Sequence, residues 1–186
     1  MSASEEYLHR CTIGELTPLA GPIVLVEYDT KWPGRFRYEA ERVRATVGGR
    51  ALRVEHVGST SVPGLMAKPI IDMILVVSDS AEEAAYVPML EKAGYQLRVR
   101  EPAWFEHRMF KGGHGDVNLH VFSLSCPEID RMVMFRDWLR TNEADRQLYA
   151  RTKRSLAQQV WKHTQNYADA KTTVINQILS RAARMG

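Results

Sequence analysis

The segment VEHVGSTSVPGLMAKPIID, residues 54–72, joins two expected strands through a bend rich in glycine and hydroxyl side chains. The first strand is expected over residues 52–57 and ends just before Gly58. The second is expected over residues 69–77, where β-branched and apolar side chains follow one another, as is typical of a strand covered on both faces. Asp72 interrupts this apolar strand. We therefore expect the bend and the Asp72 carboxyl group to open onto a common pocket.

The bend has the composition of a phosphate-binding loop. Gly58 carries no side chain, so a phosphate can approach its backbone closely. Backbone N–H groups and the hydroxyl groups of Ser59 and Thr60 can donate hydrogen bonds to phosphate oxygens, and the ammonium group of Lys68 adds a positive charge. The sequence therefore predicts a phosphate-binding site formed by Gly58, Ser59, Thr60 and Lys68.

Asp72 is the residue with the clearest chemical implication. A carboxylate within an apolar strand is costly unless it is paired, hydrogen-bonded or bound to a metal. Mg²⁺ beside a phosphate supplies such a reason, because Mg²⁺ binds one or two carboxylates together with substrate oxygens. Asp72 is therefore predicted to be a catalytic residue and a metal ligand. The alternative is that it caps a turn or pairs with Lys68.

The remaining segments predict an α/β (α+β) fold, with a mixed sheet flanked by helices and a helical C-terminal portion. Further strands are expected at 23–28, 95–99, 104–111 and 116–124, the last two joined by the glycine-rich hairpin 112–115. Helices are expected at 31–47, 80–93, 130–140, 143–161 and 166–184; the second has a capping-box pairing of Ser80 with Glu83, and Asn142 caps the fourth. We expect a single domain over residues 1–186, with a core at about 23–126 and the helical portion at about 127–186.

Composition indicates an ordinary globular protein, with 45% hydrophobic and 25% charged residues. The longest apolar run, Ile70 to Val77, is far shorter than the roughly 20 residues of a membrane-spanning helix, and the start lacks the pattern of a secretory signal. Cys11 and Cys126 have no metal-ligand spacing. A cytoplasmic protein with free thiols and no membrane partner is expected. Residues 127–186 carry 11 basic against 6 acidic side chains, a charge that attracts anions.

Residues 55–72 closely resemble the signature of the GrpB-like family of the nucleotidyltransferase superfamily. The resemblance extends from about residue 23 to about residue 180. It includes residues 28–33 with Phe36 and Glu39, residues 118–122 and 135–140, and Tyr149, Lys153, Tyr167 and Lys171. It implies nucleotide binding by Arg136, Lys153 and Lys171, a nucleoside triphosphate as substrate or ligand, and Mg²⁺ as cofactor.

The sequence departs from the pattern of that superfamily at one position. Active members carry two carboxylates two residues apart on the strand after the Gly-Ser bend, and here the second position is Ile74. Two-metal chemistry depends on such charges. Glu55 on the neighbouring strand is a candidate replacement, with a surface or salt-bridged residue as the alternative. His120 is a candidate phosphate or metal ligand or general base, because its pKa lies near neutrality; a core histidine is equally compatible with the sequence.

Two functions follow from these residues. The leading hypothesis is a nucleotidyltransferase that transfers a nucleotidyl group from a nucleoside triphosphate to a small acceptor, with Asp72, His120 and Glu55 as catalytic residues. The alternative is a catalytically inactive module of the same fold that binds a nucleotide or another phosphorylated small molecule, and Ile74 favours it. Nucleic acid is not an expected partner, because no RNA-recognition motif is present. The oligomeric state is left open.

Overall fold

A five-stranded mixed β-sheet forms the centre of the computed structural model, which describes residues 3–113 and 115–185. Its strands are β1 (Arg53–Val57), β2 (Ile71–Val77), β3 (Gln96–Glu101), β4 (His107–Gly112) and β5 (Val117–Ser123), in the order β1-β2-β5-β4-β3. Strands β2 and β5 pair in parallel, and the other neighbours pair antiparallel. The expected α+β fold with a mixed sheet is confirmed.

Helices α2 (Trp32–Val47) and α3 (Val87–Lys92) cover one face of the sheet. Alternate side chains of β2, among them Met73 and Leu75, enter a hydrophobic core with Val43 of α2 and Leu90 of α3. Side chains alternate between the two faces of a strand, so Asp72 and Ile74 point to the opposite face. The face of the sheet that lies away from α2 and α3 therefore carries Asp72, the residue predicted to be functional.

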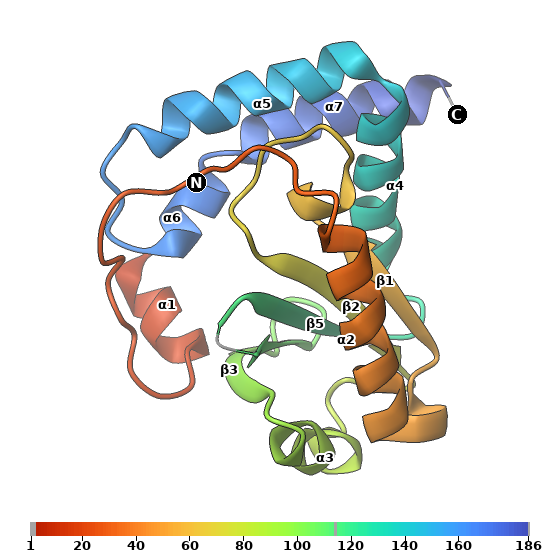
Figure 1. The fold of residues 1–186 in the computed structure, drawn as a ribbon. Helices are drawn as coiled ribbons and strands as arrows, with labels where there is room; N and C mark the ends of the chain where they lie inside the picture. The colour runs from red at the N-terminus through yellow and green to blue at the C-terminus, as the bar shows by residue number, and fades with distance from the viewer. Residues whose placement is uncertain (1–2, 114, 186) are drawn as a thin grey trace.

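The C-terminal helices α4 (Pro127–Thr141), α5 (Glu143–Ala157), α6 (Thr164–Asp169) and α7 (Thr172–Met185) lie on the side of the bend. Figure 1 shows α5 and α7 side by side, with α4 across their ends. Their shared core includes Leu139, Tyr149 and Ile178 and also takes in Val62 and Leu65 from the bend. Because these apolar contacts fix the helices on the bend, Lys153 of α5 and Lys171 of the turn between α6 and α7 lie beside it.

The N-terminal segment adds a helix that the sequence analysis did not expect. Helix α1 (Glu5–Cys11) is capped by the Ser4 side chain, which accepts a hydrogen bond from the Tyr7 N–H group. After it, Ile13 N–H donates to the Arg98 carbonyl of β3 at 2.8 Å. In Figure 1 this helix lies beside α6, where Ala3 N–H donates to Asp169. The segment therefore connects β3 to the C-terminal helices.

Five secondary-structure predictions need correction. Within the expected strand 23–28, the structure forms one isolated bridge, Val26 to Ala67. Residues 80–93 form a 3₁₀ turn, η3 (Glu83–Ala85), and then α3, because Pro88 fits the first turn of a helix but not its interior. Ser80 N–H donates to the Ser123 hydroxyl group, so the capping box with Glu83 is wrong.

The other two corrections concern the C-terminal helices. The helix expected at 143–161 ends at Ala157, and the helix expected at 166–184 is divided into α6 and α7. The predicted Asn142 cap is confirmed, since its side chain accepts a hydrogen bond from Asp145 N–H at 2.9 Å. The hairpin at 112–115 joins β4 to β5 as expected, although His114 lies outside the described residues.

Among the described residues, every helix is too short or too polar to span a lipid bilayer. Cys11 and Cys126 are both buried and unpaired in the described part of the chain, as the sequence predicts.

Candidate functional site

Gly58 and Asp72 lie in direct contact at the end of β1. The antiparallel register pairs Val57 with Asp72, which brings the residue after Val57 against the carboxyl group. Gly58 has a φ angle of 69°, and a Cβ atom added there would overlap Asp72 Oδ2 and lie 2.9 Å from its Cβ. Only glycine fits such a position without strain. The structure thus brings the bend and Asp72 together, as the sequence analysis expected.

Asp72 belongs to a hydrogen-bonded row that crosses three strands. Asn118 Nδ2 donates to Asp72 Oδ1 at 2.6 Å, and Lys111 Nζ donates to Asn118 Oδ1 at 2.5 Å. The register pairs Asp72 with Asn118 and Asn118 with Lys111, so the three side chains share one face. Burial raises the pKa of Asp72, and the hydrogen bond from Asn118 and the charge of Lys68 oppose that rise.

Four lysine side chains surround Asp72 in a cavity of about 430 Å³, here called the lysine cavity. Lys111 lies on β4 and Lys153 on α5, whereas Lys68 lies in the connection before β2 and Lys171 in the turn between α6 and α7. Asp72 is the only carboxylate among the residues that line the cavity in the described part of the chain. Positive charge therefore exceeds negative charge around this space, which suits an anion with several charges.

Lys153 is the most deeply buried of the four, with 2% of its surface exposed. Its ammonium group donates to Ser59 Oγ at 2.9 Å and to the Met66 carbonyl. No carboxylate pairs with it among residues 3–113 and 115–185. Burial, followed by the charge of Lys171, lowers the pKa of Lys153 to about 7. A buried ammonium group without a counter-ion is costly, and a bound anion at this position offsets that cost.

Lys171 is held by an aromatic ring rather than by an acid. Its Nζ lies 4.4 Å from the centroid of the Tyr167 ring, and Lys68 Nζ lies 5.8 Å from the same ring. Burial lowers the pKa of Lys171 to about 8. Cation–π contacts leave the N–H donors of an ammonium group available, so these lysines can still donate to phosphate oxygens.

The predicted phosphate-binding residues Gly58, Ser59, Thr60, Lys68, Lys153 and Lys171 all line the lysine cavity. Thr60 differs from the others in one respect. Its hydroxyl group donates to the Ile70 carbonyl at 3.1 Å and also contacts His56 Nε2. The Thr60 hydroxyl group is therefore used in hydrogen bonds within the protein, and the Ser59 hydroxyl group is better placed to bind a ligand.

Glu55 and Arg136 do not enter the lysine cavity. Arg136 Nη1 donates to Glu55 Oε2 at 2.6 Å and to the His56 carbonyl at 2.9 Å. The pair borders a separate cavity of about 420 Å³, although Arg136 also reaches a smaller cavity of about 110 Å³ beside Asp72. Glu55 also pairs with Arg53 at 2.9 Å. The prediction that Glu55 replaces the missing second carboxylate therefore needs correction, because two arginines already neutralise its charge.

The residues around Asp72 do not fit a protein-held Mg²⁺ ion. Ile74 is fully buried in the cluster under α4, and Asn118 occupies the neighbouring position on β5. Among the described residues, no three His, Cys, Asp or Glu side chains form a group suited to a metal. The nearby lysines add repulsion toward a cation. A protein-held magnesium site at Asp72 is disfavoured by this donor set.

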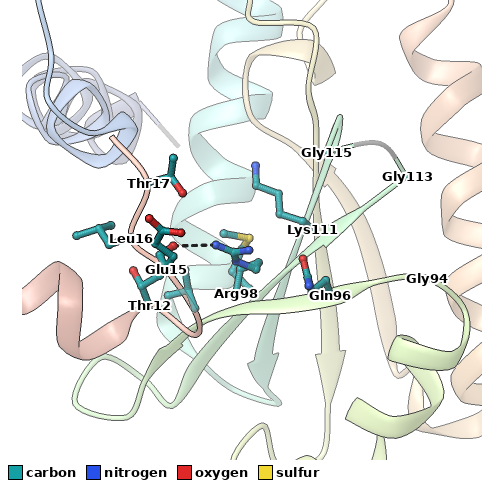
Figure 2. A pocket seen from close by; sticks show the side chains of 12 residues that line it. Thr12, Glu15, Leu16, Thr17, Gly94, Gln96, Arg98, Lys111, Gly113 and Gly115 are labelled. Carbon is teal, nitrogen blue, oxygen red and sulfur yellow. Dashed lines mark hydrogen bonds between the residues drawn. The ribbon is translucent and has the colours of Figure 1, made fainter. Parts of the chain in front are cut away.

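A second cavity of about 690 Å³, here called the polar cavity, adjoins the lysine cavity, since Lys111 and Met109 line both. Figure 2 shows Lys111, Gln96 and Arg98 on the sheet side, and Glu15 and Thr17 of the N-terminal segment opposite them. Arg98 Nη2 donates to the Glu15 carbonyl at 3.1 Å. Among the described residues, two basic side chains and one acidic side chain line this cavity, so its excess of positive charge is smaller than that of the lysine cavity.

The sequence analysis missed Lys111 and the partners of His120. The glycine-rich hairpin contained the signal for Lys111, because the register on either side of the turn sets it opposite Asn118. His120 lines the lysine cavity, and its Nδ1 atom lies 2.9 Å from His107 Nε2. Burial lowers the pKa of His120 to about 3, so the ring is neutral.

The GrpB protein family matches residues 22–181. A UPF0157 protein of Halalkalibacterium halodurans is 60% identical over 179 residues, which cover 96% of this chain and 92% of that protein. The crystal structure of the conserved protein GrpB from Enterococcus faecalis superposes with a TM-score of 0.75 at 30% identity, and the match covers 87% of this chain and 98% of that one.

A dephospho-CoA kinase of Mycolicibacterium paratuberculosis is 29% identical over 163 residues. That match covers 74% of this chain and 40% of the kinase. The matched region 22–181 contains the bend, Asp72 and all four lysines of the cavity. The chain belongs to the GrpB family.

Proposed function

We propose that this protein binds a phosphorylated small molecule, with its phosphate groups in the lysine cavity. The observation that carries the proposal is the convergence of four lysines and one carboxylate beside a glycine-containing bend. Ammonium groups and the Ser59 hydroxyl group are suitable donors for phosphate oxygens. Nucleotides are the first candidates, because the family resemblance implies them and because a relative is named dephospho-CoA kinase.

The organic part of the ligand is proposed to occupy the polar cavity. Lys111 borders both cavities, so a ligand whose phosphates contact Lys111 has its remaining atoms beside Gln96 and Arg98. The two cavities differ in charge. That difference suits a ligand with an anionic end and a neutral, polar end.

Nucleotidyl transfer is the second candidate function, and the carboxylate of Asp72 next to Ser59 is the observation that favours it. The buried Ile74 side chain and the lysines favour binding without two-metal chemistry. One assay distinguishes the two functions. Pyrophosphate release from a nucleoside triphosphate that depends on Mg²⁺ would support transfer, whereas binding that is indifferent to Mg²⁺ supports the binding module.

Thermal denaturation with ADP, pyrophosphate and adenosine tests the proposal. A ligand that binds only the folded state raises the melting temperature. We expect ADP and pyrophosphate to raise it in the presence of a metal chelator, and adenosine to have little effect. A rise with adenosine but not with pyrophosphate would contradict a phosphate site.

Replacement of Arg98 by glutamine is expected to lower the affinity for ADP about tenfold, because a hydrogen bond to a charged group contributes about 1.5–3 kcal/mol. The affinity for pyrophosphate should stay within about twofold. Isothermal titration calorimetry measures both. Arg50→Gln is the control, since Arg50 lies exposed in the turn Gly48–Arg50. An equal loss for both ligands would show that Arg98 acts only through its overall charge.

A further inference from the structure

Four side chains form a continuous hydrogen-bonded row from the N-terminal helix to the lysine cavity. Tyr7 OH donates to Glu101 Oε1 at 2.6 Å, and Glu101 Oε2 lies 2.7 Å from His107 Nδ1. His107 Nε2 lies 2.9 Å from His120 Nδ1, with the two rings stacked. His107 is 4% exposed, so the middle of the row is removed from water.

Hydrogen-bond chemistry fixes the tautomer of each ring when both are neutral. An ionised carboxylate is only an acceptor, so Glu101 requires the proton of His107 to lie on Nδ1. The Nε2 atom of His107 then carries a lone pair and accepts from His120 Nδ1–H. His120 in turn keeps no proton on Nε2, which is left as an acceptor.

The His120 ring borders a space in which four lysine donors face a single carboxylate among the described residues. The His120 ring lines the lysine cavity, and its Nε2 atom has no hydrogen-bond partner within residues 3–113 and 115–185. Burial is the main cause that lowers the pKa of His120 to about 3, so the lone pair is not protonated near neutral pH. An ionised phosphate oxygen is only an acceptor and gains nothing from this atom, whereas the hydroxyl group of an alcohol can donate to it.

We propose that His120 Nε2 accepts a hydrogen bond from a hydroxyl group adjacent to the ligand's phosphate, so that the ligand is a phosphate ester with a free hydroxyl group. This inference rests on the proposed function and narrows its ligand class. Glu101 and His107 are positioning residues that act through His120. Tyr7 belongs to the N-terminal segment, which precedes the region matched by the family.

The test uses Glu101→Gln and Tyr7→Phe, with the tautomers read by ¹⁵N NMR of the histidine rings. In the Glu101→Gln variant we expect the amide oxygen to accept from Tyr7 OH, as Glu101 Oε1 does, so that the amide nitrogen, a donor, faces His107 Nδ1. Both rings should then change tautomer, and His120 Nε2 becomes a donor. Tyr7→Phe keeps the carboxylate and should leave both tautomers unchanged.

Calorimetry at about pH 8 with methyl phosphate and glycerol phosphate gives the binding readout, because both esters are then ionised and only glycerol phosphate carries a hydroxyl donor. The wild-type protein is expected to bind glycerol phosphate about tenfold more tightly than methyl phosphate, and Glu101→Gln should remove that preference. Tyr7→Phe should retain it, and Glu101→Asp should recover part of it.

The possible results separate the two proposals. A wild-type protein that binds both probes equally, or a His120 ring protonated on Nε2, would overturn this inference and leave the phosphate site intact. Failure to bind either probe would overturn the proposed function, and this inference with it.

Discussion

Replacement of Gly58 by alanine is expected to lower the free energy of unfolding by about 3 kcal/mol. The φ angle of 69° strains any residue with a side chain, and the added Cβ overlaps the Asp72 carboxyl group, which Asn118 holds in place. Each of these two effects typically costs about 1–3 kcal/mol. Urea denaturation followed by circular dichroism measures the change as a shift of the midpoint.

Gly64→Ala is the matched control for this measurement. Gly64 has a φ angle of 76°, yet no atom lies within 4 Å of an added Cβ. The control therefore contains the backbone strain without the overlap, and we expect a loss of about 1 kcal/mol. Equal losses in the two variants would mean that Asp72 is not packed against the bend.

Replacement of Lys153 by methionine is expected to weaken pyrophosphate binding about 30-fold. Methionine approximates the volume of the side chain but removes the ammonium group that contacts Ser59 and the Met66 carbonyl. A hydrogen bond between a charged donor and a phosphate contributes about 2 kcal/mol, which corresponds to that factor. Calorimetry in the presence of a metal chelator provides the measurement.

Lys162→Met controls for the loss of one positive charge. Lys162 is exposed and pairs with Glu5 at 2.5 Å, outside the cavity. Its replacement should change pyrophosphate affinity less than about twofold, because exposed charges are screened by solvent and salt. If Lys162→Met and Lys153→Met weakened binding equally, the lysine cavity would not be the binding site.

The Lys153 variant also has an expected signature in the pH dependence of stability. Burial lowers the pKa of Lys153 from 10.5 to about 7 in the folded protein. Between these two values the unfolded chain binds one proton more at this position than the folded chain, so the free energy of unfolding rises with pH. Relative to Lys153→Met, the wild-type protein should therefore gain stability as the pH increases from about 7 to about 10.5.

The central part of the fold could be predicted because its signals are local. The apolar run of β2 with one carboxylate, the glycine-containing bend and the hairpin before β5 each lie within a few residues of the sequence. Asp72 and Gly58 meet because antiparallel pairing of β1 with β2 follows from the short connection between them. The helix start near Pro88 had a local signal that the prediction for residues 80–93 did not use, and the division of the last helix at residue 170 was not predicted.

The candidate site was predictable in part for the same reason. Glu55 was expected to act beside Asp72. Its carboxylate instead pairs with Arg136, which is 81 residues away in the sequence. The partner of His120, His107, lies only 13 residues away. The contact of Tyr7 with Glu101 was missed because these residues are 94 apart and meet only through the packing of α1 on β3. Sequence patterns report spacing along the chain. They do not report which distant charge neutralises a given side chain.

The most direct test of the account is a calorimetric titration of pyrophosphate into the wild-type protein and the Asp72→Asn variant, with a chelator and then with Mg²⁺. If the lysine cavity binds phosphate through its ammonium groups, the wild-type protein binds without metal. The variant then binds at least as tightly, because a negative charge has been removed from the site. Binding that requires Mg²⁺ in the wild-type protein and disappears in Asp72→Asn would contradict the account.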